Sequence, residues 1–146
     1  MLDSNHKTPL IFGESKRPLA LLIQNSLVID KNSLQFVTDE NANFQVGIMS
    51  REKGYIIQEH IHLETTREIQ GTSEAIFIRK GICKVSFYDS EEYSENRYEL
   101  LVAQGDVIVF FRGGHKFEMI EDCEILEIKQ GPFFGNLDKI RVQPDE

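Results

Sequence analysis

Residues 54–81 of the chain read GYIIQEHIHLETTREIQGTSEAIFIRKG, and this stretch decides how the fold is interpreted. Its first part, Tyr55–His60, is rich in β-branched and aromatic side chains, which favours a strand. Side chains two apart in a strand point to the same face, so we expect His60 and His62 to project together. Two imidazoles on one face can hold a transition metal ion. The alternative is a pair of surface histidines on a solvated strand.

Short β-rich runs continue on both sides of this stretch, and turn-prone residues separate them. All four prolines lie outside residues 19–131, which suits uninterrupted strands because proline removes a hydrogen bond of the ladder. No segment after residue 33 keeps a helical period over three turns, so the sequence predicts an all-β sandwich or barrel. Pro18–Ile29 fits either a short helix or two strands. The expected strands are Leu34–Thr38, Phe44–Met49, Tyr55–His60, Glu74–Arg79, Lys84–Tyr88, Tyr98–Val102, Asp106–Phe111, Lys116–Ile120 and Glu124–Lys129.

The length and the net charge of the chain limit the number of domains and the kinds of binding partner that it can have. The 146 residues, of which 40% are hydrophobic, indicate one globular domain with a sizeable core. We expect residues 1–33 to be an N-terminal extension that packs on a barrel formed by residues 34–142. The net charge of −8 disfavours nucleic acid and anionic membranes as partners. Cys83 and Cys123 form no CxxC pair, which is typical of reduced thiols and of a cytoplasmic protein, and one disulfide between them is the alternative.

The spacing of glycines, histidines and a glutamate in the opening stretch resembles the first motif of the cupin superfamily. That motif is a glycine, five residues, HxH, a gap, a glutamate, six residues and a second glycine. The residues that match it in this chain are Gly54, His60, His62, Glu74 and Gly81.

A second stretch, GDVIVFFRGGHKFEM at residues 105–119, is similar to the second cupin motif. It has a glycine turn, an apolar strand and a Gly–Gly turn that leads into His115. Phe111 stands where the superfamily usually has proline, and Met119 replaces the usual asparagine. The resemblance is close over residues 54–119 and extends more loosely to residues 34–142 through the strand pattern.

The gap between His62 and the glutamate departs from the superfamily pattern. Eleven residues intervene before Glu74, whereas members of the superfamily usually have only a few. Glu68 lies nearer the usual position, but twelve residues then separate it from Gly81. The apolar run directly after Glu74 fits the family's strand better, so Glu74 is the preferred carboxylate and Glu68 the alternative.

The resemblance implies a double-stranded β-barrel, or jelly roll, with a metal site in its mouth. The implied ligands of one divalent transition metal ion are His60, His62, Glu74 and His115. This donor set is compatible with Fe, Mn, Ni or Zn. Positions on the metal that the protein leaves open let it polarise a bound oxygen or activate water or dioxygen.

Candidate substrate-binding residues follow from strand alternation and from charge. Gln58 shares the face of His60, and Phe117 and Met119 share the face of His115. Arg67, in the inserted segment Leu63–Ser73, and Arg112 are candidates for binding a substrate carboxylate or phosphate. Barrel-core packing is the alternative for the apolar residues, and a solvated surface is the alternative for the arginines. The inserted segment is expected to overhang the barrel mouth as a lid.

Three functions follow from this interpretation. The first is a metal-dependent enzyme that acts on a sugar, sugar nucleotide or oxo-acid by isomerase, epimerase or dioxygenase chemistry. The second is a metal- or ligand-binding cupin without turnover. The third is a metal-free sugar ketoisomerase or epimerase with a histidine base. A homodimer is also expected, because outward apolar residues such as Ala75, Phe77 and Ile108 need cover.

Overall fold

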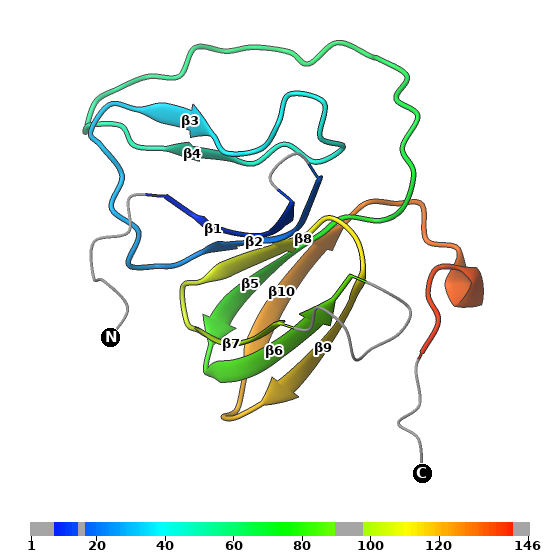
Figure 1. Cartoon of the computed structure of the whole chain (residues 1–146). Helices are drawn as coiled ribbons and strands as arrows, with labels where there is room; N and C mark the ends of the chain where they lie inside the picture. The colour runs from blue at the N-terminus through cyan, green and yellow to red at the C-terminus, as the bar shows by residue number, and fades with distance from the viewer. Residues whose placement is uncertain (1–7, 15–16, 90–97, 142–146) are drawn as a thin grey trace.

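The chain is described by a computed structural model that covers residues 8–14, 17–89 and 98–141 (Figure 1). In this part of the chain the regular elements are strands and one short 3-10 helix, so the all-β expectation is confirmed. The strands are β1 (Leu10–Glu14), β2 (Arg17–Ile23), β3 (Leu34–Phe36), β4 (Gly47–Met49), β5 (Glu74–Lys80), β6 (Ile82–Tyr88), β7 (Tyr98–Ala103), β8 (Val107–Phe110), β9 (Gly114–Met119) and β10 (Glu124–Lys129). The helix is η1 (Gly135–Leu137).

The strands form two larger antiparallel sheets and one hairpin. The first sheet has the order β1-β2-β8-β5-β10, the second has the order β7-β6-β9, and β3 pairs with β4. The described strands leave each sheet with open edges, and none of the sheets closes on itself. Figure 1 shows the β3–β4 hairpin above β1 and β2.

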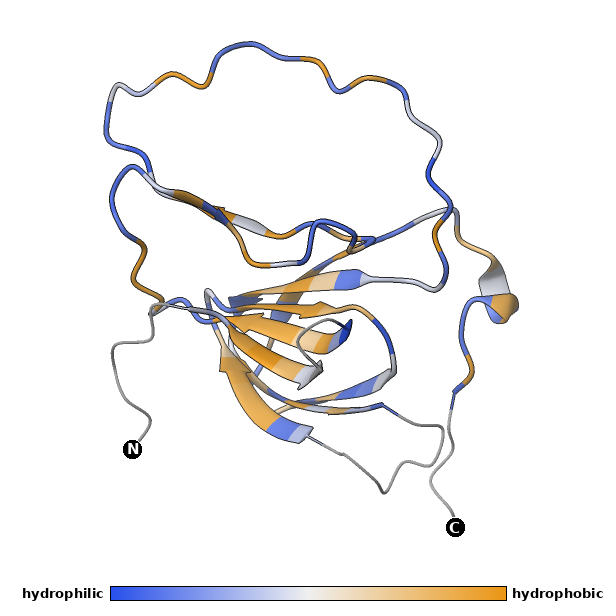
Figure 2. Cartoon of the chain, turned by 45° about the horizontal axis from the view of Figure 1, so that its top comes forward, coloured by the Kyte–Doolittle hydropathy of each residue, from blue (hydrophilic) through white to orange (hydrophobic). Residues whose placement is uncertain are grey.

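The core lies between the two larger sheets. Ile76 and Ile78 are buried and alternate with the exposed Phe77 along β5, as the period of two along a strand requires. Three successive residues of β8, 108–110, are buried, and so are Val85 and Phe87 on β6. Figure 2 shows that hydrophobic residues are concentrated in the strands, whereas the long loop is largely hydrophilic with a few hydrophobic residues. Burial of these side chains is the main term that holds the sheets together.

The N-terminal residues contribute strands to the main sheet. Of the two interpretations of Pro18–Ile29, the structure shows a strand, because β2 covers its first part and no helix forms there. The β2 strand pairs with β8, with Leu21 opposite Val109, and both of these side chains are buried. Residues before position 33 therefore supply two of the five strands of this sheet, β1 and β2.

The strand expected at Tyr55–His60 does not form, and this prediction is wrong. Residues 50–73 make one long loop from β4 to β5, which arches over the molecule (Figure 1). Within the described chain, residues 56–69 form no hydrogen bond with another segment. An extended segment becomes a strand only when a neighbouring strand pairs with it.

Among the outward apolar residues, the placement of Ile108 differs from the expectation. Its side chain is fully buried and faces the core, whereas Phe77 is exposed and Ala75 is half-buried. On the same outer face, Leu126 lies opposite Phe77 and is exposed as well. The apolar surface on β5 and β10 is thus smaller than expected, and the homodimer stays a prediction.

Candidate functional site

An open cleft of about 720 Å³ lies between the two larger sheets. The first sheet contributes Glu74, Ile76 and Phe110 to its lining, and the second contributes His115 and Phe117. The end of the long loop and the segment after β10 complete its walls. Concave sites with apolar walls and a few polar groups are the usual places for small ligands.

Glu74 and His115 meet across this cleft. Glu74 begins β5 in the first sheet, and His115 lies on β9 in the second, with Oε2 of Glu74 3.2 Å from Nε2 of His115. Phe110 stacks on the imidazole, with ring centroids 4.3 Å apart and an interplanar angle of 14°. The edge of Phe117 packs nearby, with its centroid 5.7 Å from that of His115. The two aromatic rings hold the imidazole in one orientation beside the carboxylate.

A glycine turn sets the position of His115. Gly113 has a φ of +77°, in the left-handed region that L side chains rarely adopt. A Cβ at this position would also contact the carbonyl oxygen of Tyr88 and Cδ1 of Leu19. The turn is therefore restricted to glycine by both backbone conformation and space, and it directs the chain from β8 into β9.

The electrostatics of the cleft favour an ionised Glu74. The hydrogen bond from His115 lowers the pKa of the Glu74 carboxyl, while burial of the carboxyl opposes this shift. The charges of His115, Lys129 and Lys139 lower the same pKa further. Glu74 is consequently a carboxylate at neutral pH, which is the form that can bind a metal ion or orient an imidazole.

His60 and His62 lie together on the long loop, away from this pair. Their ring centroids are 5.2 Å apart, both side chains are exposed, and Nδ1 of His60 is 2.9 Å from the carbonyl oxygen of Gln58. Neither histidine lines the cleft. The four expected ligands thus lie in two separate pairs, Glu74 with His115 and His60 with His62. Among the described residues, it forms no group of three or more metal-ligating side chains.

The other candidate residues divide in the same way. Phe117 and Arg112 line the cleft, whereas Gln58, Arg67 and the alternative carboxylate Glu68 lie on the exposed loop. Met119 is half exposed and lies on β9 outside the cleft. At the end of the loop, however, Gln70 and Thr72 do line the cleft, as expected for part of a lid segment.

Four charged residues of the cleft do not belong to the metal-ligating or substrate-binding candidates named from the sequence. Glu127 shares the inner face of β10 with Ile125, so strand alternation gave a signal for it. The other three have no such signal, because they come from the start of β2 and from the segment after η1. They are Arg17, Asp138 and Lys139.

The segment after β10 is tied to the sheet by an ion pair. Nζ of Lys129 is 3.2 Å from Oδ2 of Asp138 and lies 4.9 Å from the ring centroid of Phe133. The hydrogen bond from Lys129 to Asp138 raises the pKa of the lysine, so the ammonium is retained at neutral pH. This contact fixes one wall of the cleft and places Lys139 beside it.

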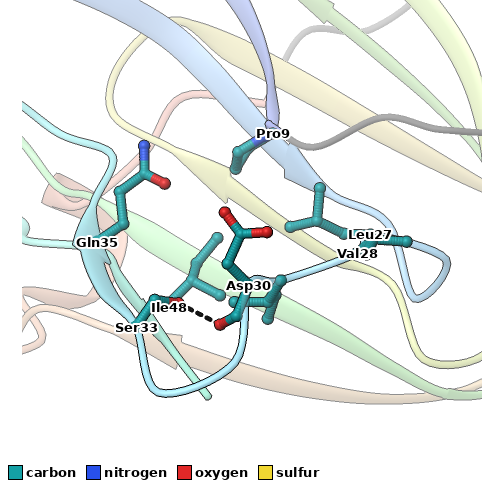
Figure 3. Close-up of a pocket in the computed structure, with 8 residues that line it drawn as sticks. Pro9, Leu27, Val28, Asp30, Ser33, Gln35 and Ile48 are labelled. Atoms are coloured by element: carbon teal, nitrogen blue, oxygen red, sulfur yellow. Dashed lines mark hydrogen bonds between the residues drawn. The ribbon is translucent and has the colours of Figure 1, made fainter.

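A second pocket is too small for the same purpose. It has a volume of about 60 Å³ and lies between the segment before β3 and the β3–β4 hairpin (Figure 3). The carboxylate of Asp30 faces the space between Pro9 and Gln35, and the hydroxyl of Ser33 donates to the carbonyl oxygen of Asp30 at 2.6 Å. A space of this size holds water, so the large cleft is the candidate site.

Comparisons with protein-family models, curated proteins and solved structures found no match to this chain. The part of the chain that the structure describes has no helix with the length and apolar character needed to cross a membrane.

Proposed function

We propose that this protein is a metal-binding cupin of the jelly-roll type that acts as a metal-dependent enzyme on a small molecule. Its metal ligands in this proposal are His60, His62, Glu74 and His115, and its substrate is a sugar, sugar nucleotide or oxo-acid. The reaction is of the isomerase, epimerase or dioxygenase type. The observation that carries the proposal is the Glu74–His115 pair, which joins the two sheets inside the large cleft.

The carboxylate and the imidazole in the cleft are groups that bind divalent transition metal ions, but the cleft holds too few of them for a complete site. A carboxylate and an imidazole supply two ligands, whereas such sites hold three or four protein ligands. The exposed loop carries the other pair, His60 and His62, already close together. The fit is therefore complete only if the loop brings this second pair to the first.

Three features of the structure support such an approach of the loop. Its end already reaches the cleft through Gln70 and Thr72. Ile61 and Leu63 are 87% and 83% exposed, so packing them against a sheet would be favourable. In the second sheet, β9 is an edge strand, and an edge strand offers unpaired backbone groups to an extended segment.

When bound, the metal ion supplies Lewis-acid activation of a coordinated oxygen. The chain's own residues have separate tasks in the proposal. Glu74 supplies negative charge, Phe110 holds the ring of His115, and Ile76 and Phe117 keep the wall beside the pair apolar. These apolar side chains reduce the contact of the pair with water, which strengthens charge interactions at the site.

The test is metal binding to the full chain, measured by calorimetry with Zn²⁺, Ni²⁺, Mn²⁺ and Fe²⁺ under anaerobic conditions. The variants are the double substitutions His60→Ala/His62→Ala and Glu74→Gln/His115→Ala, with Glu68→Gln as the matched carboxylate control. We expect each double variant to lose most of the affinity and the control to retain it.

Equal loss in both double variants indicates one shared site, because the two pairs then act on the same ion. Binding that depends on His60 and His62 but is unchanged in Glu74→Gln/His115→Ala would identify a surface chelate and overturn the proposal. Loss of binding in Glu68→Gln would transfer the carboxylate role to Glu68.

One observation favours a second candidate, a metal-free isomerase or epimerase. In the structure the Glu74–His115 pair is formed without the loop histidines, and Glu74 orients the imidazole through Nε2. Nδ1 of His115 is then the atom that removes a proton beside a substrate carbonyl and returns it to the neighbouring carbon. Exchange of a substrate proton with solvent in chelator-treated protein, abolished by His115→Ala and retained in His60→Ala/His62→Ala, would favour this second function.

A further inference from the structure

We infer that the ligand of the large cleft carries an anionic group, a phosphate or a carboxylate, which Arg17 and Lys139 bind at the rim. This inference deepens the proposed function and rests on it for the identity of the cleft as the ligand site. It names a substrate class and two binding residues, and it does not depend on how the metal ligands are assembled.

The first step in the argument is the placement of the cations. Arg17 begins β2, and Lys139 follows η1, so residues from opposite ends of the chain line the same cleft. Both side chains are exposed and can reach a solvent-borne ligand.

The second step is the charge balance of the cleft. Two of its other charged groups are paired with groups of opposite charge, because Arg112 pairs with Asp89 and Asp138 pairs with Lys129. Glu74 faces the imidazole of His115, and Glu127 lies 4.0 Å from the same Lys129. Among the residues that the structure describes, Arg17 and Lys139 form no such pair.

The third step concerns Arg112, which the sequence had suggested as an anion-binding residue. Its guanidinium pairs with Asp89 and donates from Nη2 and Nε to the carbonyl oxygen of Arg17, at 3.2 and 3.4 Å. Arg112 thus positions the backbone that carries Arg17. It holds the rim in place, while Arg17 and Lys139 supply the charge for the ligand.

The fourth step is the contrast with the whole chain. The net charge is −8, so the surface as a whole repels small anions. Two cations that line the same cleft oppose this effect locally, and the aromatic side chains of the cleft, Phe110, Phe111 and Phe117, lower the local dielectric constant. A guanidinium and an ammonium together suit a phosphate or a carboxylate at one end of a small molecule.

The experiment measures anion binding to the full chain after metal removal by a chelator, so that the metal site contributes nothing. The probes are inorganic phosphate and acetate, with glycerol as the neutral control, at constant ionic strength. Binding is followed by the chemical shifts of backbone amides in β8 and β9. The variants are Arg17→Ala and Lys139→Ala, with Lys53→Ala on the exposed loop as the matched control for loss of one positive charge.

We expect the wild type and Lys53→Ala to bind at least one of the two anions equally well. Arg17→Ala and Lys139→Ala should each weaken this binding at least fivefold, and Arg17→Lys should restore part of it. Phosphate binding alone would assign a phosphorylated ligand class, and acetate binding alone a carboxylate class. Unchanged affinity in either alanine variant, or equal loss in Lys53→Ala, would overturn the inference.

The failure of this inference and the failure of the proposed function are distinguishable. The Arg17 and Lys139 variants should bind Zn²⁺ and Ni²⁺ like the wild type, since neither residue is a proposed ligand. Anion binding that depends on both cations in a chain without metal affinity would support the anionic ligand and reject the metal site. Metal binding without anion binding would support the metal site and reject the anionic ligand.

Discussion

The paired sheets and the loop of residues 50–73 contain the same kinds of side chain and differ in structure. Ile78 in β5 is fully buried, whereas Ile57 in the loop is 57% exposed. Ile78 has paired strands on both sides, because β5 lies between β8 and β10. The loop has no hydrogen-bonded neighbour over residues 56–69 in the described chain. Strand propensity alone therefore does not make a strand, and pairing together with burial does.

The same difference divides the candidate metal site. Glu74 and His115 belong to the paired sheets, and register and stacking hold them 3.2 Å apart. His60 and His62 belong to the loop, and only their proximity in sequence keeps them together. The following predictions test how far this division holds in solution.

The largest effect is expected from truncating matched isoleucines in the metal-free protein. Ile78→Ala should lower the free energy of unfolding by about 2–5 kcal/mol, because it leaves a cavity in the core. Ile57→Ala should change it by less than about 0.5 kcal/mol. Urea denaturation of both variants provides the measurement. A large loss in Ile57→Ala would show that the loop is packed in solution, and the contrast between the regions would fail.

Two glycines with positive φ provide the next comparison. Gly113 (φ +77°) lies in the turn before His115, and Gly54 (φ +90°) lies within the loop, where a Cβ added to it would have nothing within 4 Å. Replacement of either glycine by alanine should lower the free energy of unfolding by about 1–2 kcal/mol, because alanine is strained in the left-handed backbone conformation. Gly113→Ala should cost about 1 kcal/mol more, because its Cβ contacts Tyr88 and Leu19. Thermal unfolding measures both, and equal losses would contradict the close packing of the turn.

A smaller effect is expected from pH. The pKa of Glu74 is lowered from its ordinary value of 4.5, mainly by the hydrogen bond from His115. The carboxylate therefore stabilises the fold above pH 4.5, and this contribution is lost as the pH falls through the lowered folded-state pKa. The stability difference between wild type and Glu74→Gln should shrink over that range.

Glu68→Gln is the control for this titration, because Glu68 lies on the exposed loop away from His115. Its stability difference from wild type should stay near zero at every pH. A stability difference for Glu74→Gln that is constant from neutral to acidic pH would contradict the pairing with His115.

The last prediction concerns the chemical reactivity of a buried and an exposed thiol, and it involves the smallest expected change in stability. Burial, together with the neighbouring Cys123, raises the pKa of the Cys83 thiol to about 11. In a Cys123→Ser background, Cys83 should resist iodoacetamide at pH 8 until denaturant is added. A cysteine introduced by Ile61→Cys on the exposed loop should react in the native protein. Rapid labelling of Cys83 would show that the core opens readily.

Local pattern in the sequence was sufficient for the β class and for half of the candidate site. The apolar run after Glu74 predicts where β5 begins, because side-chain alternation is a local property. The Gly–Gly turn predicts a strand after His115, at Lys116, whereas β9 begins two residues earlier and includes His115. Glu127 had the same kind of signal through the alternation of β10.

Only the tertiary structure decided which segments have partners. The run at Tyr55–His60 has the composition of a strand, yet pairing depends on a neighbour that local pattern does not specify. Arg17 and Lys139 share a cleft because β2 pairs with β8 and Lys129 holds Asp138. Such contacts join residues far apart in the chain, so they depend on how the sheets face each other.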